Sequence, residues 1–145
     1  MVAYTFKPRF VEPVSSREKR QTIRGVGKKR HARPGDTLQL YTGPRMRPRK
    51  FGEATCETSR QVTLAFGDAT KRPFVTFGPP SDAGPGDILI TPAELDAFAV
   101  SDGFADWQGL ADFWAETHDN PVEWTGILIT WGDTFRPETT GESHD

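Results

Sequence analysis

Proline and glycine break this chain into short segments, and this constrains its fold more than any other feature. The 145 residues include 12 prolines and 14 glycines, so few uninterrupted stretches can form a long helix or strand. The chain has the length of one domain and enough residues to bury a core. We therefore expect a single domain built from many short elements that are joined by turns.

The segments between these breaks have mostly strand character. Alternating or β-branched residues predict strands at residues 2–6, 37–41, 51–66 (with a break near 57–60), 74–77 and 124–131. The last of these is the most apolar, so we expect it inside a sheet. Residues 78–86 are rich in glycine and proline and predict a linker. Residues 134–145 are polar, and we expect them to form a disordered tail after a domain at residues 1–133.

Helical signals occur at three places. Pro8 is suited to begin a short helix, which Pro13 keeps brief or irregular. The sequence Thr91-Pro92-Ala93-Glu94 has the pattern of a helix N-terminus, and this helix is expected to run to about Val100. Apolar residues at helical spacing predict another helix before His118, with a face made by Phe104, Trp107, Leu110, Phe113 and Trp114. The order of elements predicts an α+β fold, in which helices flank a small curved or closed sheet of short strands.

Charge is divided unevenly along the chain. Residues 1–50 hold 14 lysines and arginines against three acidic residues, whereas residues 51–145 hold four against 17. The net charge of −2 therefore conceals a basic half, which is typical of proteins that bind a polyanion. The alternative is that the two halves neutralise each other in the folded protein. Most basic residues fall in loops rich in glycine and proline, which favours exposed charges and an anionic partner.

The basic residues concentrate in two segments, residues 17–33 and the loop at residues 42–50. We expect both to line a groove for RNA or a nucleotide, with contacts from Arg17, Arg20, Arg24, Lys28, Lys29, Arg30, Arg33, Arg45, Arg47, Arg49 and Lys50. Tyr41, at the end of a predicted strand, is expected either to stack on a base or to belong to the core. The alternative for the loop residues is solvated charge. For Arg24 it is an ion pair with Asp102 or Asp106.

Some locations and kinds of site are not indicated. No apolar run approaches the length of a membrane span, and the N-terminus has no signal-peptide pattern. The single Cys56 cannot form an internal disulfide, so we expect a reducing, cytoplasmic location and an inert thiol. One cysteine and three scattered histidines have no zinc-site spacing, and no glycine-rich phosphate loop is found. We therefore expect neither a metal nor a cofactor.

Three motifs resemble the ASCH domain, a member of the PUA-like superfamily. Lys19-Arg20-Gln21-Thr22-Ile23-Arg24 is similar to the family's Lys-x-x-Thr-Ile-Arg signature near the N-terminus. Pro34-Gly35-Asp36, followed by the strand at 37–41, resembles the segment of glycine, aspartate and strand that comes next. Ser101-Asp102-Gly103-Phe104-Ala105-Asp106-Trp107 resembles the acid-glycine-phenylalanine turn that leads into a helix. Their order and spacing agree with the family, and together they span most of residues 3–131.

The resemblance implies a PUA-like β-barrel with flanking helices and a cleft beside it that binds RNA or a nucleotide. Some ASCH proteins remove the acetyl group from 4-acetylcytidine, and others are described as ribonucleases. The catalytic lysine and threonine of the amidohydrolases correspond to Lys19 and Thr22. Their glutamate falls near Asp102, whose carboxylate is one methylene shorter. The two loops rich in arginine go beyond the smallest family members, which implies a larger nucleic-acid partner than a free nucleoside.

Each of these three candidate catalytic residues has a chemical role and an ordinary alternative. Lys19 is suited to hold a phosphate or a developing oxyanion, or to lower the pKa of a hydroxyl; otherwise it is a solvated lysine. Thr22 becomes a nucleophile beside a base, and is otherwise a common strand residue. Asp102 is suited to act as a general base or to fix Lys19, or else to cap a helix. Residues 19 and 22 point to opposite faces of a straight strand, so joint action requires a turn or bulge near Arg20.

Three functions remain open at this point. The first is a nucleic-acid-binding domain that uses the basic groove between Lys19 and Lys50, and we rank it first because the basic loops are visible without the resemblance. The second is a hydrolase that acts on RNA or on an acylated nucleoside through Lys19, Thr22 and Asp102. The third is a charge-balanced accessory protein, whose mark would be a protein complex that survives high salt.

Overall fold

The chain folds into short elements, as the frequent prolines and glycines predict. A computed structural model describes residues 1–27, 30–78 and 88–138. In chain order the elements are β1 (Val2–Phe6), the 3₁₀ helix η1 (Pro8–Phe10), α1 (Val11–Ser15), β2 (Gln21–Arg24), β3 (Thr37–Thr42), β4 (Arg49–Thr55), β5 (Thr58–Ala65), β6 (Phe74–Phe77), β7 (Ile88–Leu89), α2 (Pro92–Ser101), α3 (Trp107–Thr117), β8 (Glu123–Thr130) and β9 (Arg136–Pro137). Of the predicted linker at residues 78–86, the described residues include Gly78 alone.

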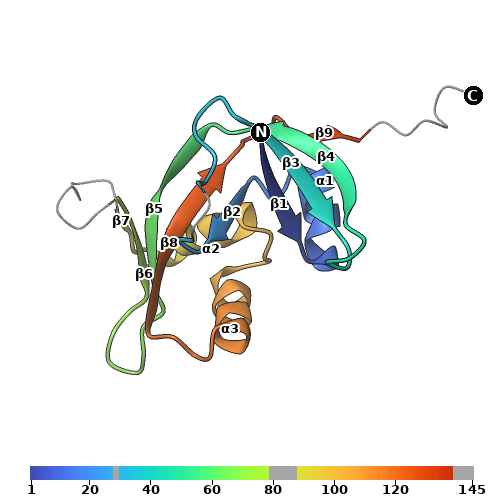
Figure 1. The fold of residues 1–145 in the computed structure, drawn as a ribbon. Helices are drawn as coiled ribbons and strands as arrows, with labels where there is room; N and C mark the ends of the chain where they lie inside the picture. Colours follow the sequence, from blue (N-terminus) through green and yellow to red (C-terminus); the bar gives the residue numbers. More distant parts are fainter. Residues whose placement is uncertain (28–29, 79–87, 139–145) are drawn as a thin grey trace, which may run out of the picture.

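The strands form two open sheets. The first has the order β1-β3-β4-β9, in which β1 and β3 are parallel and the other neighbours are antiparallel. The second has the order β2-β8-β5-β6-β7 and is antiparallel throughout. In the view of Figure 1 the second sheet lies on the left and the first on the right, with α2 and α3 drawn between and below them.

The closed PUA-like β-barrel expected from the sequence is wrong, although the class is α+β. A barrel has no edges, because its last strand pairs with its first. Here, within the described residues, the first sheet ends in β1 and β9 and the second in β2 and β7. β1 and β2 follow each other in the chain but lie in different sheets, and a side chain connects them: Arg24 donates to the backbone carbonyl of Thr5. Alternation identifies a strand and its faces but not the strand beside it, so it does not distinguish closed from open sheets.

In the order of the described strands the chain changes sheet four times, and the last two changes, between β4 and β5 and between β8 and β9, occur at short connections. Between β4 and β5, Cys56 N donates to Asp36 O at 2.9 Å while Glu57 N donates to Thr130 O at 2.8 Å, so adjacent residues join different sheets. This is the break expected near residues 57–60. After β8 the chain returns to the first sheet, where Phe135 is buried and β9 pairs with β4. The structure thus places residues 134–138 against the sheet, although we expected the tail to begin at 134. Residues 139–145 lie outside the described part.

Most predicted elements are confirmed, with small shifts at their ends. The strands at 2–6 and 74–77 agree with β1 and β6, and the apolar strand β8 has a partner on each side. Thr91 and Glu94 form the predicted capping box: Thr91 Oγ1 accepts from Glu94 N at 3.1 Å and Glu94 Oε1 from Thr91 N at 3.0 Å. Arg49 and Lys50 belong to β4, so the second basic loop is shorter than predicted.

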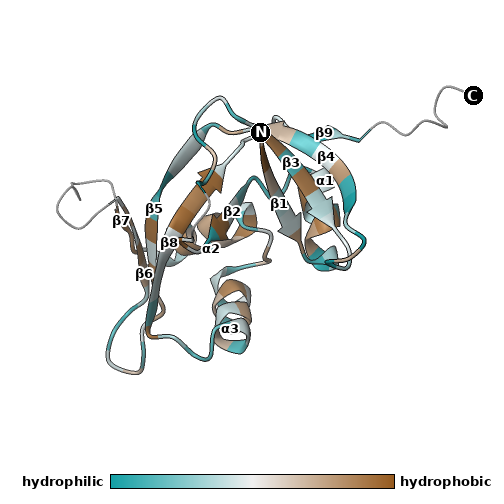
Figure 2. Ribbon diagram, in the orientation of Figure 1, coloured by the Kyte–Doolittle hydropathy of each residue, from teal (hydrophilic) through white to brown (hydrophobic). Residues whose placement is uncertain are grey.

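The core is a single cluster of buried apolar side chains that connects both sheets with the helices. Aromatic contacts attach the helices to the second sheet: Phe98 to Phe77, Trp107 to Phe66, and Trp114 to Trp124. Figure 2 shows hydrophobic stretches along β8 and hydrophilic residues in the connecting loops. None of the helices in the described residues has both the length and the apolar character that crossing a membrane requires.

Candidate functional site

A turn after α1 sets the position of Lys19. Arg17 has a φ of 70°, in the left-handed region that non-glycine residues seldom occupy. The backbone then turns back, so that Lys19 N donates to Pro13 O at 2.9 Å, and Arg20 N donates to Ser101 O at 2.7 Å. Since β2 begins only at Gln21, Lys19 lies outside the strand. The turn lies at residues 16–17, before Lys19 and not near Arg20 as expected, yet the side chains of Lys19 and Thr22 both line one pocket.

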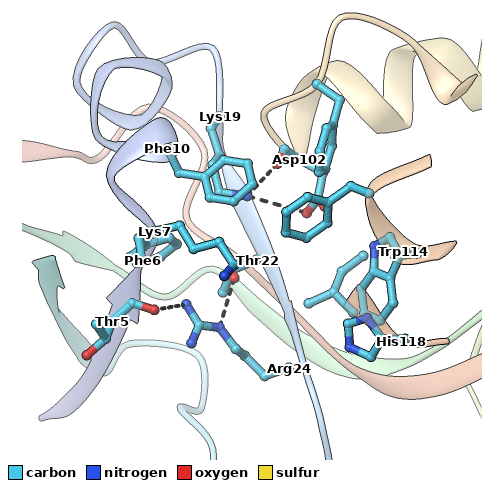
Figure 3. Close-up of a pocket in the computed structure, with 13 residues that line it drawn as sticks. Thr5, Phe6, Lys7, Phe10, Lys19, Thr22, Arg24, Asp102, Trp114 and His118 are labelled. Atoms are coloured by element: carbon cyan, nitrogen blue, oxygen red, sulfur yellow. Dashed lines mark hydrogen bonds and ion pairs between the residues drawn. The ribbon is translucent and has the colours of Figure 1, made fainter. Parts of the chain in front are cut away.

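The pocket lies where the edge strands β1 and β2 face the C-terminal end of α2 and the C-terminal half of α3. Its volume is about 250 Å³. Figure 3 shows Lys7, Thr22 and Arg24 on one side and Trp114 and His118 on the other, with Lys19 and Asp102 at one end. The complete lining is Thr5, Phe6, Lys7, Phe10, Lys19, Thr22, Ile23, Arg24, Asp102, Phe104, Phe113, Trp114 and His118. Three cations and several aromatic rings thus surround one small cavity, which we call the Lys19 pocket.

Lys19 and Asp102 form a buried pair. They are 3% and 4% exposed. Lys19 Nζ donates to Asp102 O at 2.5 Å and lies 3.6 Å from Asp102 Oδ1. Gln21 Nε2 donates to the same Oδ1 at 3.4 Å. Asp102 caps the C-terminal end of α2 rather than the N-terminus of α3, because Asp106 accepts from Gly109 N and caps α3. Because both its carbonyl and its carboxylate contact Lys19 Nζ, Asp102 is suited to fix the position of Lys19.

Burial shifts the pKa of both partners toward their neutral forms. It lowers the pKa of the Lys19 ammonium to about 8, with Asp102 opposing the shift and the positive charge of Arg24 adding to it. It also raises the pKa of the Asp102 carboxyl, and Lys19 and Gln21 oppose this change. Desolvation penalises charge, so it acts in opposite directions on an acid and a base. Lys19 is thus easier to deprotonate than an exposed lysine, as a group that transfers protons must be.

Gly103 allows α2 and Lys19 to approach each other. Its φ is +98°, and a Cβ atom there would lie 2.9 Å from Lys19 Cδ and 3.0 Å from Phe10 Cδ1. Both the backbone conformation and the contact exclude a larger residue without strain. Phe10 also places its ring 4.7 Å from Lys19 Nζ, which adds a cation–π contact to the buried ammonium.

Arg24 connects the two edge strands across the pocket. Its Nε donates to Thr22 Oγ1 and one of its terminal nitrogens to Thr5 O, both at 3.0 Å. Its guanidinium also lies 4.8 Å from the ring centre of Phe6 and 5.0 Å from that of Tyr4. The direct ion pair of Arg24 with Asp102 or Asp106 does not occur among the contacts of the described residues. Thr22 Oγ1 accepts from Arg24, which leaves its own proton free to donate.

The opposite wall consists of aromatic residues from α3. Trp114 stacks on the His118 ring with their centres 4.0 Å apart, and Trp124 of β8 packs against both rings. This burial lowers the pKa of His118. Trp114 therefore belongs to the core and to the pocket at once, while Trp107 and Trp131 are core residues.

The other predicted basic contacts do not gather around the Lys19 pocket. The loop before Thr37 and the loop after Thr42 flank β3, so they lie at opposite ends of the pair that β3 forms with β1. The five residues of β1 span roughly 16 Å at about 3.3 Å per residue. Arg30 and Arg33 lie at one end of this strand pair, and Arg45 and Arg47 at the other. The basic residues thus form two separate clusters rather than one groove, and Lys28 and Lys29 fall outside the described residues.

Several of these side chains already have partners. Lys50 lies 2.6 Å from Glu53 and 3.6 Å from Glu138, and Arg30 lies 3.2 Å from Asp36, so part of the basic charge is neutralised internally. Arg17 donates to Phe135 O, and Arg20 donates to Arg17 O. Tyr41 is half-buried in β3, and Arg33, Arg45, Arg47 and Arg49 are exposed.

No family model, no curated protein and no solved structure matches this chain.

The sequence identified Lys19, Thr22, Arg24 and Asp102 as site residues, and the structure brings these four together. It did not identify the residues from β1 and from the end of α3, such as Lys7 and His118. The ASCH-like motifs do not include them, and their contribution depends on how the two sheets and α3 are arranged. The sequence contains one indication of His118: it lies four residues after Trp114, so it shares the aromatic face of the predicted helix. Cys56 is buried, and burial raises its pKa, in agreement with an inert thiol.

Proposed function

We propose that this protein is an ASCH-like nucleic-acid-binding domain, and that the Lys19 pocket holds one base or nucleotide of an RNA strand. The observation that carries the proposal is the composition of the pocket. Lys7, Lys19 and Arg24 supply positive charge beside a wall of aromatic rings. Recognition of single-stranded RNA combines these two features, because bases stack on aromatic side chains and cations pair with phosphates.

The size of the pocket and the positions of the basic clusters favour a strand over a free nucleoside. A cavity of about 250 Å³ is below the roughly 300–1,000 Å³ of sites for drug-sized ligands, so it suits one base. The exposed Arg45 and Arg47 lie beyond the end of β3, outside this cavity. An RNA strand with one base in the pocket would carry its neighbouring phosphates along the protein surface toward Arg45 and Arg47. We also expect a reducing, cytoplasmic location, because the single cysteine is free and buried.

A hydrolase is the second candidate, and the lowered pKa of Lys19 favours it. In this case Thr22 Oγ attacks the acyl carbon of an acylated nucleoside, the nucleoside amine leaves with a proton, and water then releases the acid from Thr22. Lys19 or Arg24 would stabilise the oxyanion. Asp102 would hold Lys19 in place through the contacts described above. In the resting structure the contact of Thr22 Oγ1 is with Arg24, so Lys19 would have to approach it during the reaction.

The test is binding of a fluorescent single-stranded RNA of about 12 nucleotides by wild type and by Arg24→Gln. The glutamine keeps a polar, though shorter, side chain and removes the charge. We expect weaker binding for Arg24→Gln, by roughly tenfold if one charge-assisted contact is lost. Lys71→Gln is the matched control, because Lys71 is exposed in the turn after Asp68, away from the pocket lining.

Absence of RNA binding by folded wild type would overturn the proposal. Incubation of the same proteins with 4-acetylcytidine separates the two candidates. Release of acetate by wild type, lost in Thr22→Val, would show that the site is catalytic. Binding without release in any sample supports the binding domain.

A further inference from the structure

We propose that His118 accepts a hydrogen bond, through Nε2, from an N–H group of the ligand in the Lys19 pocket. This inference rests on the proposed function, since it names a chemical requirement on the ligand of the same site. His118 follows the last turn of α3 and lines the pocket beside Trp114 (Figure 3). It belongs to none of the motifs that resemble the ASCH domain.

Hydrogen bonds at the end of α3 determine which ring nitrogen of His118 carries the proton. Thr117 Oγ1 lies 2.7 Å from Phe113 O and 2.8 Å from His118 Nδ1. A carbonyl oxygen only accepts, so the single hydroxyl proton of Thr117 is donated to Phe113. Thr117 Oγ1 is then the acceptor of its second contact, which places a proton on His118 Nδ1. In the neutral ring, Nε2 therefore keeps its lone pair and can only accept.

The surroundings of His118 hold the ring in one orientation and favour its neutral form. The ring stacks on Trp114 at an interplanar angle of 25° and meets the edge of Trp124 at 69°. The residue as a whole is exposed, but partial desolvation against these rings lowers the pKa of the imidazole, and no acidic side chain of the described residues forms an ion pair with it. The stacking contacts and the hydrogen bond with Thr117 thus favour one orientation and one tautomer of the ring before a ligand arrives, as suits a group that selects its partner.

The two sides of the pocket then call for different groups on the ligand. Lys7 and Arg24 are donors and suit a phosphate or a carbonyl oxygen, whereas His118 Nε2 suits a donor. Phe104, Phe113 and Trp114 line the pocket with aromatic rings that provide apolar contact for a flat ligand ring. The structure therefore assigns to this pocket a base that bears an exocyclic amino group, such as that of a cytidine or adenosine nucleotide.

The experiment combines loss of the donor in the ligand with loss of the acceptor in the protein. The ligands are cytidine and adenosine 5′-monophosphates and the same nucleotides with the amino group dimethylated. The proteins are wild type and His118→Phe, which keeps an aromatic ring over Trp114 and removes both nitrogens. We expect wild type to bind each amino nucleotide roughly five- to tenfold more tightly than its dimethylated form, the range that a neutral hydrogen bond supports. His118→Phe should bind the two forms within about twofold of each other.

A second variant tests the assigned tautomer. Thr117→Val keeps the branched shape and removes the hydroxyl that accepts from Nδ1. The ring is then free to move its proton to Nε2, so preference for the amino nucleotide should fall to between the values for wild type and His118→Phe. Thermal unfolding of each variant reports whether the end of α3 is still folded.

The possible results separate this inference from the function on which it rests. Equal loss of affinity for both nucleotide forms in His118→Phe would make His118 a packing residue and overturn the inference, while the binding function stands. Wild type that binds both forms equally would also overturn it. Wild type that binds neither the nucleotides nor RNA would overturn the proposed function, and the inference with it.

Discussion

Lys19 Nζ donates a hydrogen bond to the backbone carbonyl of Asp102 at the C-terminal end of α2 and lies 3.6 Å from the carboxylate of the same residue. A cation is favourable at this end of a helix, where backbone carbonyls lack partners. The pair is buried, so its desolvation is costly. It connects the segment before β2 with α2, and the shape of the Lys19 pocket depends on it.

The first prediction concerns the stability of this pair. Lys19→Met has a side chain of similar length without the charge, and it leaves the Asp102 carboxylate buried without its cation. Removal of one partner of a buried pair costs roughly 3–5 kcal/mol, so we expect a fall of this order in the free energy of unfolding in urea. Lys19→Met/Asp102→Asn should recover part of the loss, because no charge is then left in the core. Equal stability of Lys19→Met and wild type would contradict the described burial.

The second prediction concerns the effect of pH. The pKa of Lys19 is lowered in the folded protein to about 8 from 10.5. Between these values the unfolded chain binds more protons than the folded one, so the free energy of unfolding increases with pH in this window. The free energy of unfolding of wild type minus that of Lys19→Met should therefore increase from pH 8 to about 10.5, by no more than roughly 1.4 kcal/mol per pH unit. Burial raises the pKa of Cys56 and Tyr4, which lowers the free energy of unfolding at high pH in both proteins and so cancels in this difference.

A constant difference between these two proteins across that window would show that Lys19 keeps its proton as firmly in the fold as in the unfolded chain. Lys71→Met serves as the control, because Lys71 is exposed and lies away from the pocket lining.

The third prediction separates two causes of strain at Gly103. Gly103→Ala places a Cβ atom 2.9 Å from Lys19 Cδ and requires alanine at a φ of +98°. Gly35 has a φ of +93° but no atom within 4 Å of such a Cβ, so Gly35→Ala measures the conformational cost alone. We expect a cost of roughly 1–2 kcal/mol for Gly35→Ala from the left-handed backbone conformation and about 1–3 kcal/mol more for Gly103→Ala from crowding. Equal costs in chemical denaturation would mean that Lys19 and Phe10 move aside freely.

Much of the local structure follows from the sequence, because it depends on neighbours in the chain. Thr91 and Glu94 define the start of α2 from four residues, and the alternation of residues 37–41 identifies β3. The motif predicted a shared site for Lys19 and Thr22, and both side chains line the Lys19 pocket. The turn expected near Arg20 instead lies at residues 16–17, before Lys19.

What the sequence did not predict depends on contacts between distant residues. No local sequence pattern indicates that β1 pairs with β3 while β2 pairs with β8, so the sequence led us to expect a closed barrel in place of two open sheets. The partners of Lys50 and Arg30 are likewise set by the fold, and two clusters of charge were predicted as one groove. His118 enters the site only because the end of α3 lies opposite Arg24, which no spacing in the sequence shows.

The fourth prediction concerns the loop before β3. Tyr4 Oη accepts from Ala32 N at 3.1 Å and bonds to His31 Nδ1 at 3.0 Å. Tyr4→Phe leaves the buried Ala32 N–H without a partner, which costs roughly 1–3 kcal/mol. Tyr41→Phe is the matched control, since no hydrogen bond of the Tyr41 hydroxyl is found among the described contacts. We expect lower thermal stability and faster amide exchange at Ala32 for Tyr4→Phe only; equal effects of both variants would contradict a role of the hydroxyl.

The last prediction tests whether RNA extends beyond the Lys19 pocket. Arg45 and Arg47 are exposed between β3 and β4, and neither lines the pocket. If they contact phosphates, Arg45→Ala/Arg47→Ala should weaken binding of a 12-nucleotide RNA and reduce the salt dependence of the affinity, by about 0.7 in the slope of log K against log salt for each lost contact. Affinity for a single nucleotide should not change, because the pocket is intact. Lys71→Ala/Arg72→Ala removes the same charge from the turn between β5 and β6. An equal change in slope for this control would indicate general attraction between the protein and RNA, whereas a change confined to Arg45 and Arg47 would place the strand along the end of β3.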